Sequence, residues 1–287
     1  MTQLSIAPEY WRAIWMTALG SIILSVDSLL FRLLEADLWT AAFWRLLLMG
    51  IAVTLYIYIR RRRMIVTDLS LIGWTMLPAV LCMSASNLGF LYGLTHTTVA
   101  DTLAIIATAP VFSAIFAMAL GERPPLRTWI AAAAVAVGIA LIFGAGFSGG
   151  GWRGQLGAAT AAICIAIFFT LCRLKRGVEM TPALGLSSFA SAGLAAILAT
   201  TLAPPAGDWP VLLLLGWLVL PAALITLGPR HLPAAEVGLL MLLETALGPL
   251  WVWLALGEEP SAETLAGGAL ILGALIAHSL AALRRRR

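Results

Sequence analysis

The sequence predicts an all-α integral membrane protein with ten transmembrane helices, arranged as two inverted five-helix repeats. Composition is the first observation behind this prediction. Of the 287 residues, 61% are hydrophobic and only 11% are charged, and the mean hydropathy is +0.97. A water-soluble domain of this length cannot bury so many apolar side chains. The second observation is a repeat, because LIGWTMLPAVL at 71–81 and LLGWLVLPAAL at 214–224 agree at seven of eleven positions.

Apolar stretches of about 20 residues, the length that crosses a bilayer, define the predicted helices. They are 12–33, 38–59, 70–93, 98–120, 126–145, 154–173, 182–203, 209–228, 234–256 and 263–283. The first repeat takes in residues 1–146 and the second residues 147–287. Because five crossings reverse the direction of the chain, the second repeat is upside down, an arrangement typical of secondary transporters. Pro and Gly predict breaks in the helices 70–93, 98–120, 209–228 and 234–256.

Basic side chains predict the orientation of the chain, because cytoplasmic loops carry an excess of Lys and Arg. If the N-terminus is cytoplasmic, 15 of the 18 basic residues lie on the inner side. The outer loops then hold only Arg32 and Arg153, and Arg45 lies within a span. We therefore expect a multi-pass protein of a bacterial inner membrane with both termini in the cytoplasm. The basic runs are expected to contact anionic lipid rather than nucleic acid.

No motif for ATP binding, for a metalloprotease or for a serine hydrolase occurs in the chain. The three cysteines, Cys82, Cys164 and Cys172, lie in or at the edge of apolar spans and suggest neither a disulfide framework nor a metal site. We expect no catalytic residue, no metal and no cofactor.

Three ionisable residues lie deep within predicted spans, where charges are costly and usually functional. Asp27 and Arg45 fall at a similar depth, roughly 10 Å from the outer ends of their helices, so we expect them to form an ion pair. The pair either locks two helices together or acts as a gate or substrate contact. Glu244 falls near the bilayer midplane. It either binds a proton or an amine, or is a neutral carboxyl that bonds to a neighbouring helix.

A substrate cavity would also need polar and apolar walls. Thr108 aligns with Glu244 between the repeats, so the two are expected to face each other, while Ser84 and Asn87 either line the polar path or pack helices together. In the alternative interpretation, the apolar side chains at these depths pack in the core or against lipid. The candidates for the apolar wall are Trp15, Phe90, Phe112, Phe168, Phe169, Met241 and Trp251. Asp101 is expected to be solvated near the outer mouth.

Two Gly-Glu pairs recur, at 121–122 and 257–258. Gly commonly ends a helix in the left-handed conformation. Each Glu is expected to lie at the first turn of the next helix, where the helix dipole attracts negative charge.

These pairs belong to longer segments, TAPVFSAIFAMALGER at 108–123 and LETALGPLWVWLALGEE at 243–259. Together with Arg45 and the ten spans, they resemble the drug/metabolite transporter superfamily, EamA type. The size and general pattern are most similar to the bacterial amino-acid and metabolite exporters, including the YddG-type aromatic amino-acid exporters. The resemblance implies a central cavity enclosed by the helices 12–33, 70–93, 98–120, 154–173, 209–228 and 234–256. The helices 126–145 and 263–283 would lie outside it.

The sequence therefore favours a secondary transporter that exports a small amphiphilic metabolite, above all a neutral or aromatic amino acid, by alternating access. A proton-coupled exporter of lipophilic cations is the alternative, and a membrane-embedded enzyme is a distant one, because no catalytic cluster is present. A channel would need a continuous polar pore, which the sequence lacks. We expect the partners to be the substrate and lipid, and the chain to act as a monomer, with a dimer as the alternative.

The orientation is directly testable. A reporter enzyme that is active only in the periplasm, fused after Arg287, should be silent in bacterial cells, because the basic residues hold the C-terminus inside. The same reporter placed in the predicted outer loop after Arg153 should be active and serves as the control. Activity of the C-terminal fusion would contradict the predicted topology.

Overall fold

Helices account for each of the ten predicted spans in the computed structural model, which describes residues 8–61, 73–118, 126–149, 151–174, 180–218 and 234–284. The helices are α1 (Pro8–Leu24), α2 (Asp27–Arg32), α3 (Leu38–Arg61), α5 (Met76–His96), α6 (Val99–Ile106), α7 (Ala109–Ala117), α8 (Leu126–Gly149), α9 (Trp152–Leu174), α10 (Thr181–Leu198), α11 (Trp209–Trp217), α13 (Ala234–Leu256) and α14 (Ala262–Arg284). Short 3₁₀ turns at Gly73–Thr75 and Ala206–Asp208 precede α5 and α11.

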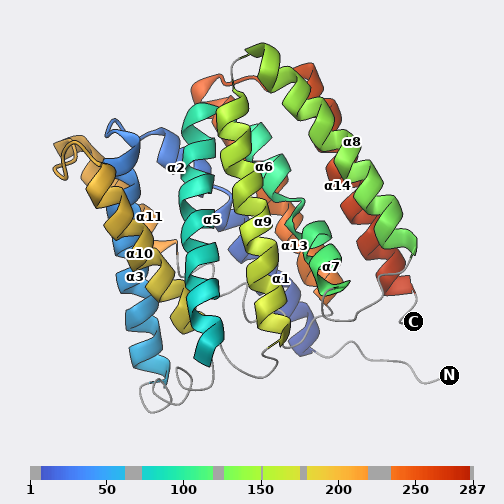
Figure 1. The fold of residues 1–287 in the computed structure, drawn as a ribbon, viewed down its shortest axis with the longest axis horizontal. Coiled ribbons are helices and arrows are strands. Elements are labelled where there is room, and N and C mark those ends of the chain that lie inside the picture. The colour runs from blue at the N-terminus through green and yellow to red at the C-terminus, as the bar shows by residue number, and fades with distance from the viewer. Residues whose placement is uncertain are drawn as a thin grey trace.

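Five stretches of these helices are long and apolar enough to cross a membrane: Ile14–Arg32, Leu38–Ile59, Gly73–His96, Trp152–Cys172 and Thr181–Leu198. Shorter apolar helices fill the other positions of the bundle, in which most helices run roughly along one direction (Figure 1). We call the end at which α1 begins and α14 ends the basal end, and the opposite end the distal end. The predicted all-α membrane fold is confirmed.

Two of the predicted spans are divided within the part of the chain that the structure describes. The span 98–120 divides into α6 and α7 at Ala107 and Thr108, as predicted, because Pro110 has no N–H to donate to the preceding turn. The span 12–33 divides into α1 and α2 at Ser25 without any proline, which the sequence analysis did not predict. At both divisions a hydroxyl donates a hydrogen bond to a carbonyl of the preceding helix. Ser25 Oγ donates to Ile22 O at 2.6 Å, and Thr108 Oγ1 donates to Ile105 O at 2.6 Å.

The predicted breaks in the spans 70–93 and 234–256 are wrong. From Met76 onward α5 is continuous, with Pro78 in its first turn, where a missing N–H costs no helical bond. The helix α13 continues through Pro249, since neighbouring helices can compensate a lost bond in a membrane bundle. The span 209–228 is described only as far as Leu218, so its second half lies outside the described residues.

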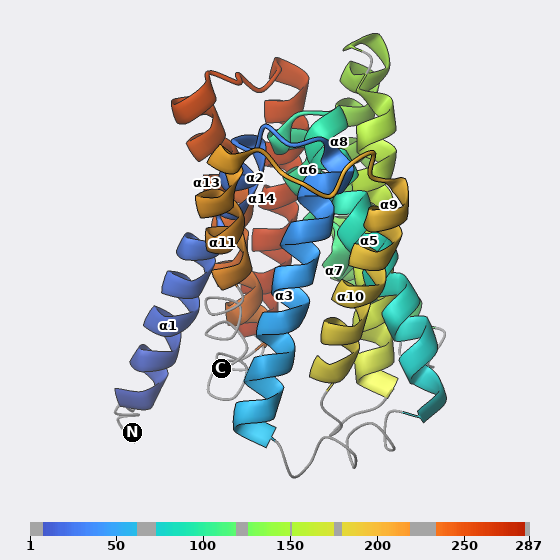
Figure 2. The ribbon, with the colours of Figure 1, turned by 90° about the vertical axis from the view of Figure 1, so that its left-hand side faces the viewer.

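The helix pairs that pack together follow an inverted repeat. The second-repeat counterparts of α3, α5 and α8 are α10, α11 and α14. Accordingly α3 packs on α10 and α8 packs on α14, each helix against its own counterpart (Figures 1 and 2). The interface of α5 with α10 likewise corresponds to that of α11 with α3, and the interface of α7 with α9 corresponds to that of α13 with α1.

Glycines allow two of these helix pairs to approach closely. A Cβ atom at Gly89 of α5 would lie 2.6 Å from the carbonyl oxygen of Gly157 on α9. A Cβ atom at Gly267 of α14 would lie 2.6 Å from the carbonyl oxygen of Gly138 on α8. Such contacts are the usual way that helices associate in lipid, where no hydrophobic force acts between them.

The contact between α5 and α9 predicts the effect of one methyl group. Gly89→Ala should lower the free energy of unfolding by about 1–3 kcal/mol, the usual cost of overpacking, because the opposing atom is backbone and cannot rotate away. Gly193→Ala on α10 is the matched control, since no atom lies within 4 Å of a Cβ there. Thermal unfolding of both purified variants in detergent measures the difference. Equal stability of the two variants would contradict the close approach.

Candidate functional site

A cavity of about 250 Å³ lies inside the bundle. Its walls come from both repeats and combine three charged residues with two small polar and nine apolar ones. The lining residues are Leu24, Asp27, Arg45, Met49, Met83, Ser86, Asn87, Phe90, Leu103, Ile106, Ile165, Leu215, Leu218 and Glu244.

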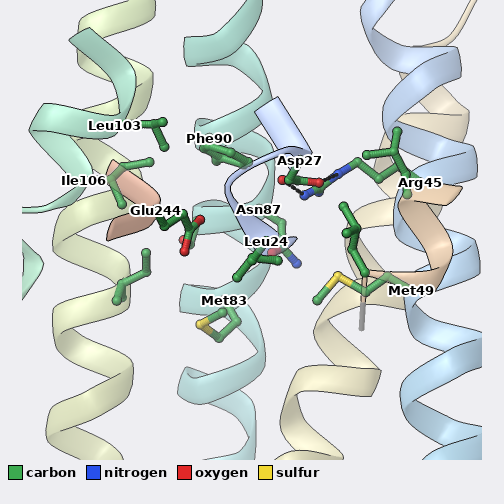
Figure 3. A pocket seen from close by; sticks show the side chains of 14 residues that line it. Leu24, Asp27, Arg45, Met49, Met83, Asn87, Phe90, Leu103, Ile106 and Glu244 are labelled. Carbon is green, nitrogen blue, oxygen red and sulfur yellow. Dashed lines mark hydrogen bonds and ion pairs between the residues drawn. The ribbon is translucent and has the colours of Figure 1, made fainter. Parts of the chain in front are cut away.

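The predicted ion pair stands at one side of this cavity, across the interface of α2 and α3 (Figure 3). Arg45 Nη2 donates to Asp27 Oδ2 at 2.6 Å, and Arg45 Nε donates to Asp27 Oδ1 at 3.3 Å. Both side chains are about nine-tenths buried. The guanidinium carbon of Arg45 also lies 5.6 Å from the ring centre of Phe90, within the range of cation–π attraction. The two-point geometry fixes the guanidinium plane while Asp27 neutralises its charge.

Glu244 reaches into the cavity from α13, on the side opposite the ion pair (Figure 3). No other charged side chain besides Asp27 and Arg45 lines the cavity among the described residues. The arrangement thus presents one paired charge and one carboxyl group that has no basic neighbour of its own.

The other predicted site residues divide into two groups. Asn87 and Phe90 line the cavity as expected, and Asn87 Nδ2 also donates to Ser191 Oγ of α10 at 3.4 Å. Ser84 is directed to the helix interface instead, because its hydroxyl donates to Ser187 O at 3.1 Å. The packing alternative therefore holds for Ser84.

Thr108 does not face Glu244 across the cavity. It is fully buried, and its hydroxyl bonds to the carbonyl of Ile105, so it serves the division between α6 and α7. An alignment of repeats places two residues at the same depth, but it does not say which way each side chain points.

Most of the expected aromatic wall lies elsewhere. Trp15 is 70% exposed on the outside of α1, and Phe169 is also exposed. Phe168 packs in an apolar cluster with Ala79 and Met180. Phe112 and Trp251 are likewise absent from the cavity lining, and the side chain of Met241 lies outside the described residues.

The cavity wall is instead aliphatic and thioether in character. Met49 of α3 and Met83 of α5 line it beside Leu24, and sequence reasoning missed all three. Methionine is flexible and polarisable, which suits it to walls that accept varied apolar groups. Met83 directly precedes the polar run at 84–87, and that position was the available signal.

The prediction that the helices 126–145 and 263–283 lie outside the cavity agrees with the structure. No lining residue comes from α8 or α14 within the described part of the chain. The expected set omitted α3, however, which contributes both Arg45 and Met49.

A salt bridge and several hydrogen bonds connect the helices at the distal end of the bundle. Arg32 pairs with Glu258 at 3.0 Å and donates to Thr97 O at 2.8 Å. Glu258 also accepts from the backbone N–H of Val99 at 2.9 Å, at the first residue of α6. The expectation that Glu258 stabilises the helix that follows it is wrong, because it caps a helix of the other repeat. Gly257 has a φ of +69°, which confirms the predicted left-handed helix end; Gly121-Glu122 lies outside the described residues.

Asp101 is a second tie at this end, and the expectation that it is solvated is wrong. Its side chain is only 4% exposed and accepts hydrogen bonds from Thr97, Gln155 and Thr264. Asp208, 3% exposed, accepts from the backbone N–H groups of Glu35 and Ala36. These carboxylates therefore join loops and helices from both repeats at the distal end.

Comparison with known proteins bears on this arrangement. Residues 11–144 match the model of the EamA-like transporter family. The resemblance to the EamA-type drug/metabolite transporters is confirmed. The family match covers the first half of the chain, and it supports a multi-pass membrane transporter of that type.

Solved structures show the same fold. Nine chains match, and one of them, a crystal structure described only as "Crystal structure of protein", has a TM-score of 0.64 and 19% sequence identity. The alignment covers 96% of this chain and 99% of the other. No curated protein matches the chain.

The ion pair predicts strong coupling between two residues. Asp27→Asn or Arg45→Gln alone should destabilise the protein by about 3 kcal/mol or more, because each leaves a buried charge without its partner. The double variant should lose less than the sum of the two single losses. Thermal inactivation of the four proteins in one detergent gives the cycle, and strict additivity would mean that the two side chains do not interact.

Proposed function

We propose that this transporter exports neutral amino acids with apolar side chains by alternating access through the central cavity. The observation that carries the proposal is the lining of the cavity. Glu244 faces the Asp27–Arg45 pair across a space otherwise bounded mainly by aliphatic and thioether groups. A zwitterion with an apolar body is the solute that matches all of these features together.

The charged ends of an amino acid have separate partners in this proposal. The ammonium group would bind Glu244. The carboxylate would bind Arg45, because a guanidinium has five N–H donors and Asp27 engages only its Nε and Nη2 groups. Asn87 and Ser86 of α5 also line the cavity and offer further hydrogen bonds.

The apolar walls would hold the side chain of the substrate. Leu24, Met49, Leu103, Ile106 and Ile165 are among the residues that bound the cavity. Phe90 is its one aromatic ring within the described part of the chain. A leucine- or methionine-like side chain therefore suits the wall at least as well as an aromatic one.

Other solute classes suit the cavity less well. A sugar needs many convergent hydrogen bonds, and a phosphorylated solute needs more basic groups than one paired arginine. A lipophilic cation of drug size is the closer competitor, since Glu244 could bind it. Pockets for drug-sized ligands usually measure about 300–1,000 Å³, and the cavity of about 250 Å³ is smaller.

The direction of transport and the cellular location belong to the same proposal. Export follows from the resemblance to bacterial exporters. The basic asymmetry of the sequence favours the bacterial inner membrane with cytoplasmic termini. The distal end would then face outward, and the contacts of Arg32, Glu258 and Asp101 there would correspond to an inward-facing or occluded state of the cycle.

Glu244 provides the test of this function. Glu244→Gln should reduce leucine counterflow in liposomes about tenfold or more, because a charge-assisted hydrogen bond to an ammonium contributes about 1.5–3 kcal/mol. Glu259→Gln, the same substitution at an exposed loop residue, is the matched control and should leave counterflow unchanged.

Three labelled solutes discriminate between the candidate functions: leucine, tryptophan and a quaternary amine. Wild-type protein should exchange leucine and, more slowly, tryptophan. Exchange of the quaternary amine alone would replace the amino-acid proposal with that of a cation exporter. Unchanged leucine exchange by Glu244→Gln would remove this residue from substrate binding.

A further inference from the structure

One face of α1 and α2 carries a row of buried hydroxyl groups. Thr17, Ser21, Ser25 and Ser28 recur at intervals of three or four residues, which places them on one side of the helix. All four are at most 2% exposed. We call this row, with the face of α13 that packs against it, the hydroxyl seam.

Three of these hydroxyls have no hydrogen-bond partner: Thr17 Oγ1, Ser21 Oγ and Ser28 Oγ. This is unusual within the molecule. Several hydroxyls on other helices bond to a carbonyl one turn back, as Thr160 does to Leu156 O and Ser188 does to Leu184 O. A fourth hydroxyl without a partner among the described side chains, Ser113 Oγ, lies apart on α7.

An unpaired hydroxyl in an apolar interior loses free energy unless a water molecule or another polar group reaches it. These hydroxyls could donate to carbonyls of their own helix, as hydroxyls elsewhere in the chain do, but they do not. The hydrogen-bonding capacity of Thr17, Ser21 and Ser28 is therefore unused by the described residues. Packing of small residues alone explains their size but not their unused hydrogen-bonding capacity.

The register of α1 and α13 brings this row to Glu244. Trp251 Nε1 of α13 donates to Ser25 Oγ at 2.8 Å, and a Cβ atom at Gly248 would lie 3.6 Å from Ser25 O. Both helices run toward the distal end. Ser21 and Glu244 each lie four residues earlier than Ser25 and Gly248, so they share a level, and Thr17 lies about 6 Å further toward the basal end.

That spacing suits a chain of water molecules. A gap of about 6 Å between successive hydroxyls is too long for one hydrogen bond of about 2.8 Å, but one water molecule between them makes two such bonds. Leu24 of α1 and Glu244 both line the cavity. Glu244 thus stands where the seam and the substrate cavity meet.

We propose that the hydroxyl seam is a water-lined proton path between the basal end and Glu244, separate from the route of the substrate. When the ammonium group of a substrate binds, the O–H bond of the protonated Glu244 carboxyl breaks. The proton passes to water in the seam, and the carboxylate that remains pairs with the ammonium. The inference rests on the proposed transport function and adds to it an exchange of one proton for one substrate.

The charged groups around Glu244 are compatible with this exchange. The cavity brings only Asp27 and Arg45 toward it from α2 and α3, and these neutralise each other. The described cavity residues of α1, α5, α6, α9 and α11 are uncharged. Protonation of Glu244 therefore changes the net charge of the cavity from negative to neutral.

The test separates proton movement from substrate movement in the full-length protein. Liposomes contain a trapped pH indicator, and labelled leucine is the solute. Counterflow of leucine against leucine needs no net proton transfer, whereas a net leucine gradient should move protons. The Thr17→Val/Ser21→Ala variant should keep counterflow, while the rate of proton movement falls about tenfold, equivalent to about 1.4 kcal/mol in the barrier.

Two further proteins keep the test interpretable. Thr160→Val/Ser188→Ala removes the same groups where they are bonded within their own helices, and it should retain both activities. Thr17→Ser retains the hydroxyl and should also retain proton movement, which a purely steric role of Thr17 would not predict.

Wild-type proton movement in the Thr17→Val/Ser21→Ala variant would overturn the inference. So would leucine gradients that move no protons in the wild type, and in that case continued counterflow would leave the proposed function intact. Absence of leucine counterflow in the wild type would refute the proposed function, and the inference with it. If the double variant does not fold, the comparison of Thr17→Val with Thr17→Ser decides in the same way.

Discussion

The cost of placing charge away from water governs the centre of this protein. A carboxylate or a guanidinium in the middle of a bilayer is stable only when it is paired or reaches a polar cavity. Asp27 and Arg45 satisfy each other through two hydrogen bonds, and Glu244 has only the cavity. The division of the first span at Ser25 immediately precedes Asp27, so the position of the ion pair depends on that local end of the helix.

Side-chain hydroxyls have three different uses in the bundle. At Ser25 and Thr108 they donate hydrogen bonds to carbonyls near a helix end. Along α5 and α10 they join helices, as Ser84 does with Ser187. On α1 and α2, the hydroxyls of Thr17, Ser21 and Ser28 have no partner among the described residues. A hydroxyl in a membrane helix is therefore best interpreted from its partner, since the residue type alone fits each of these roles.

The distal end shows how the repeats are joined. Arg32 and Val99 lie in the first repeat and Glu258 in the second, yet one carboxylate bonds to both. Asp101 and Asp208 make comparable connections in buried positions. Because these bonds cross between the repeats, the two repeats can separate at the distal end only if the bonds break.

The sequence by itself determined the class of the protein, the ten spans and the depth of its charged residues. These features depend on hydrophobic length and on spacing along a helix, which local sequence contains. It also predicted the partnership of Asp27 and Arg45, because two opposite charges at one depth have few other solutions. Only the tertiary structure decided which side chains face the cavity. Trp15 and Thr108 occupy suitable depths, but the rotation of their helices turns one outward and buries the other. Met49 and Met83 enter the wall for the same reason. Rotation about a helix axis is set by packing against neighbouring helices, and in a chain that is apolar on nearly every face the sequence has no amphipathic pattern to report it.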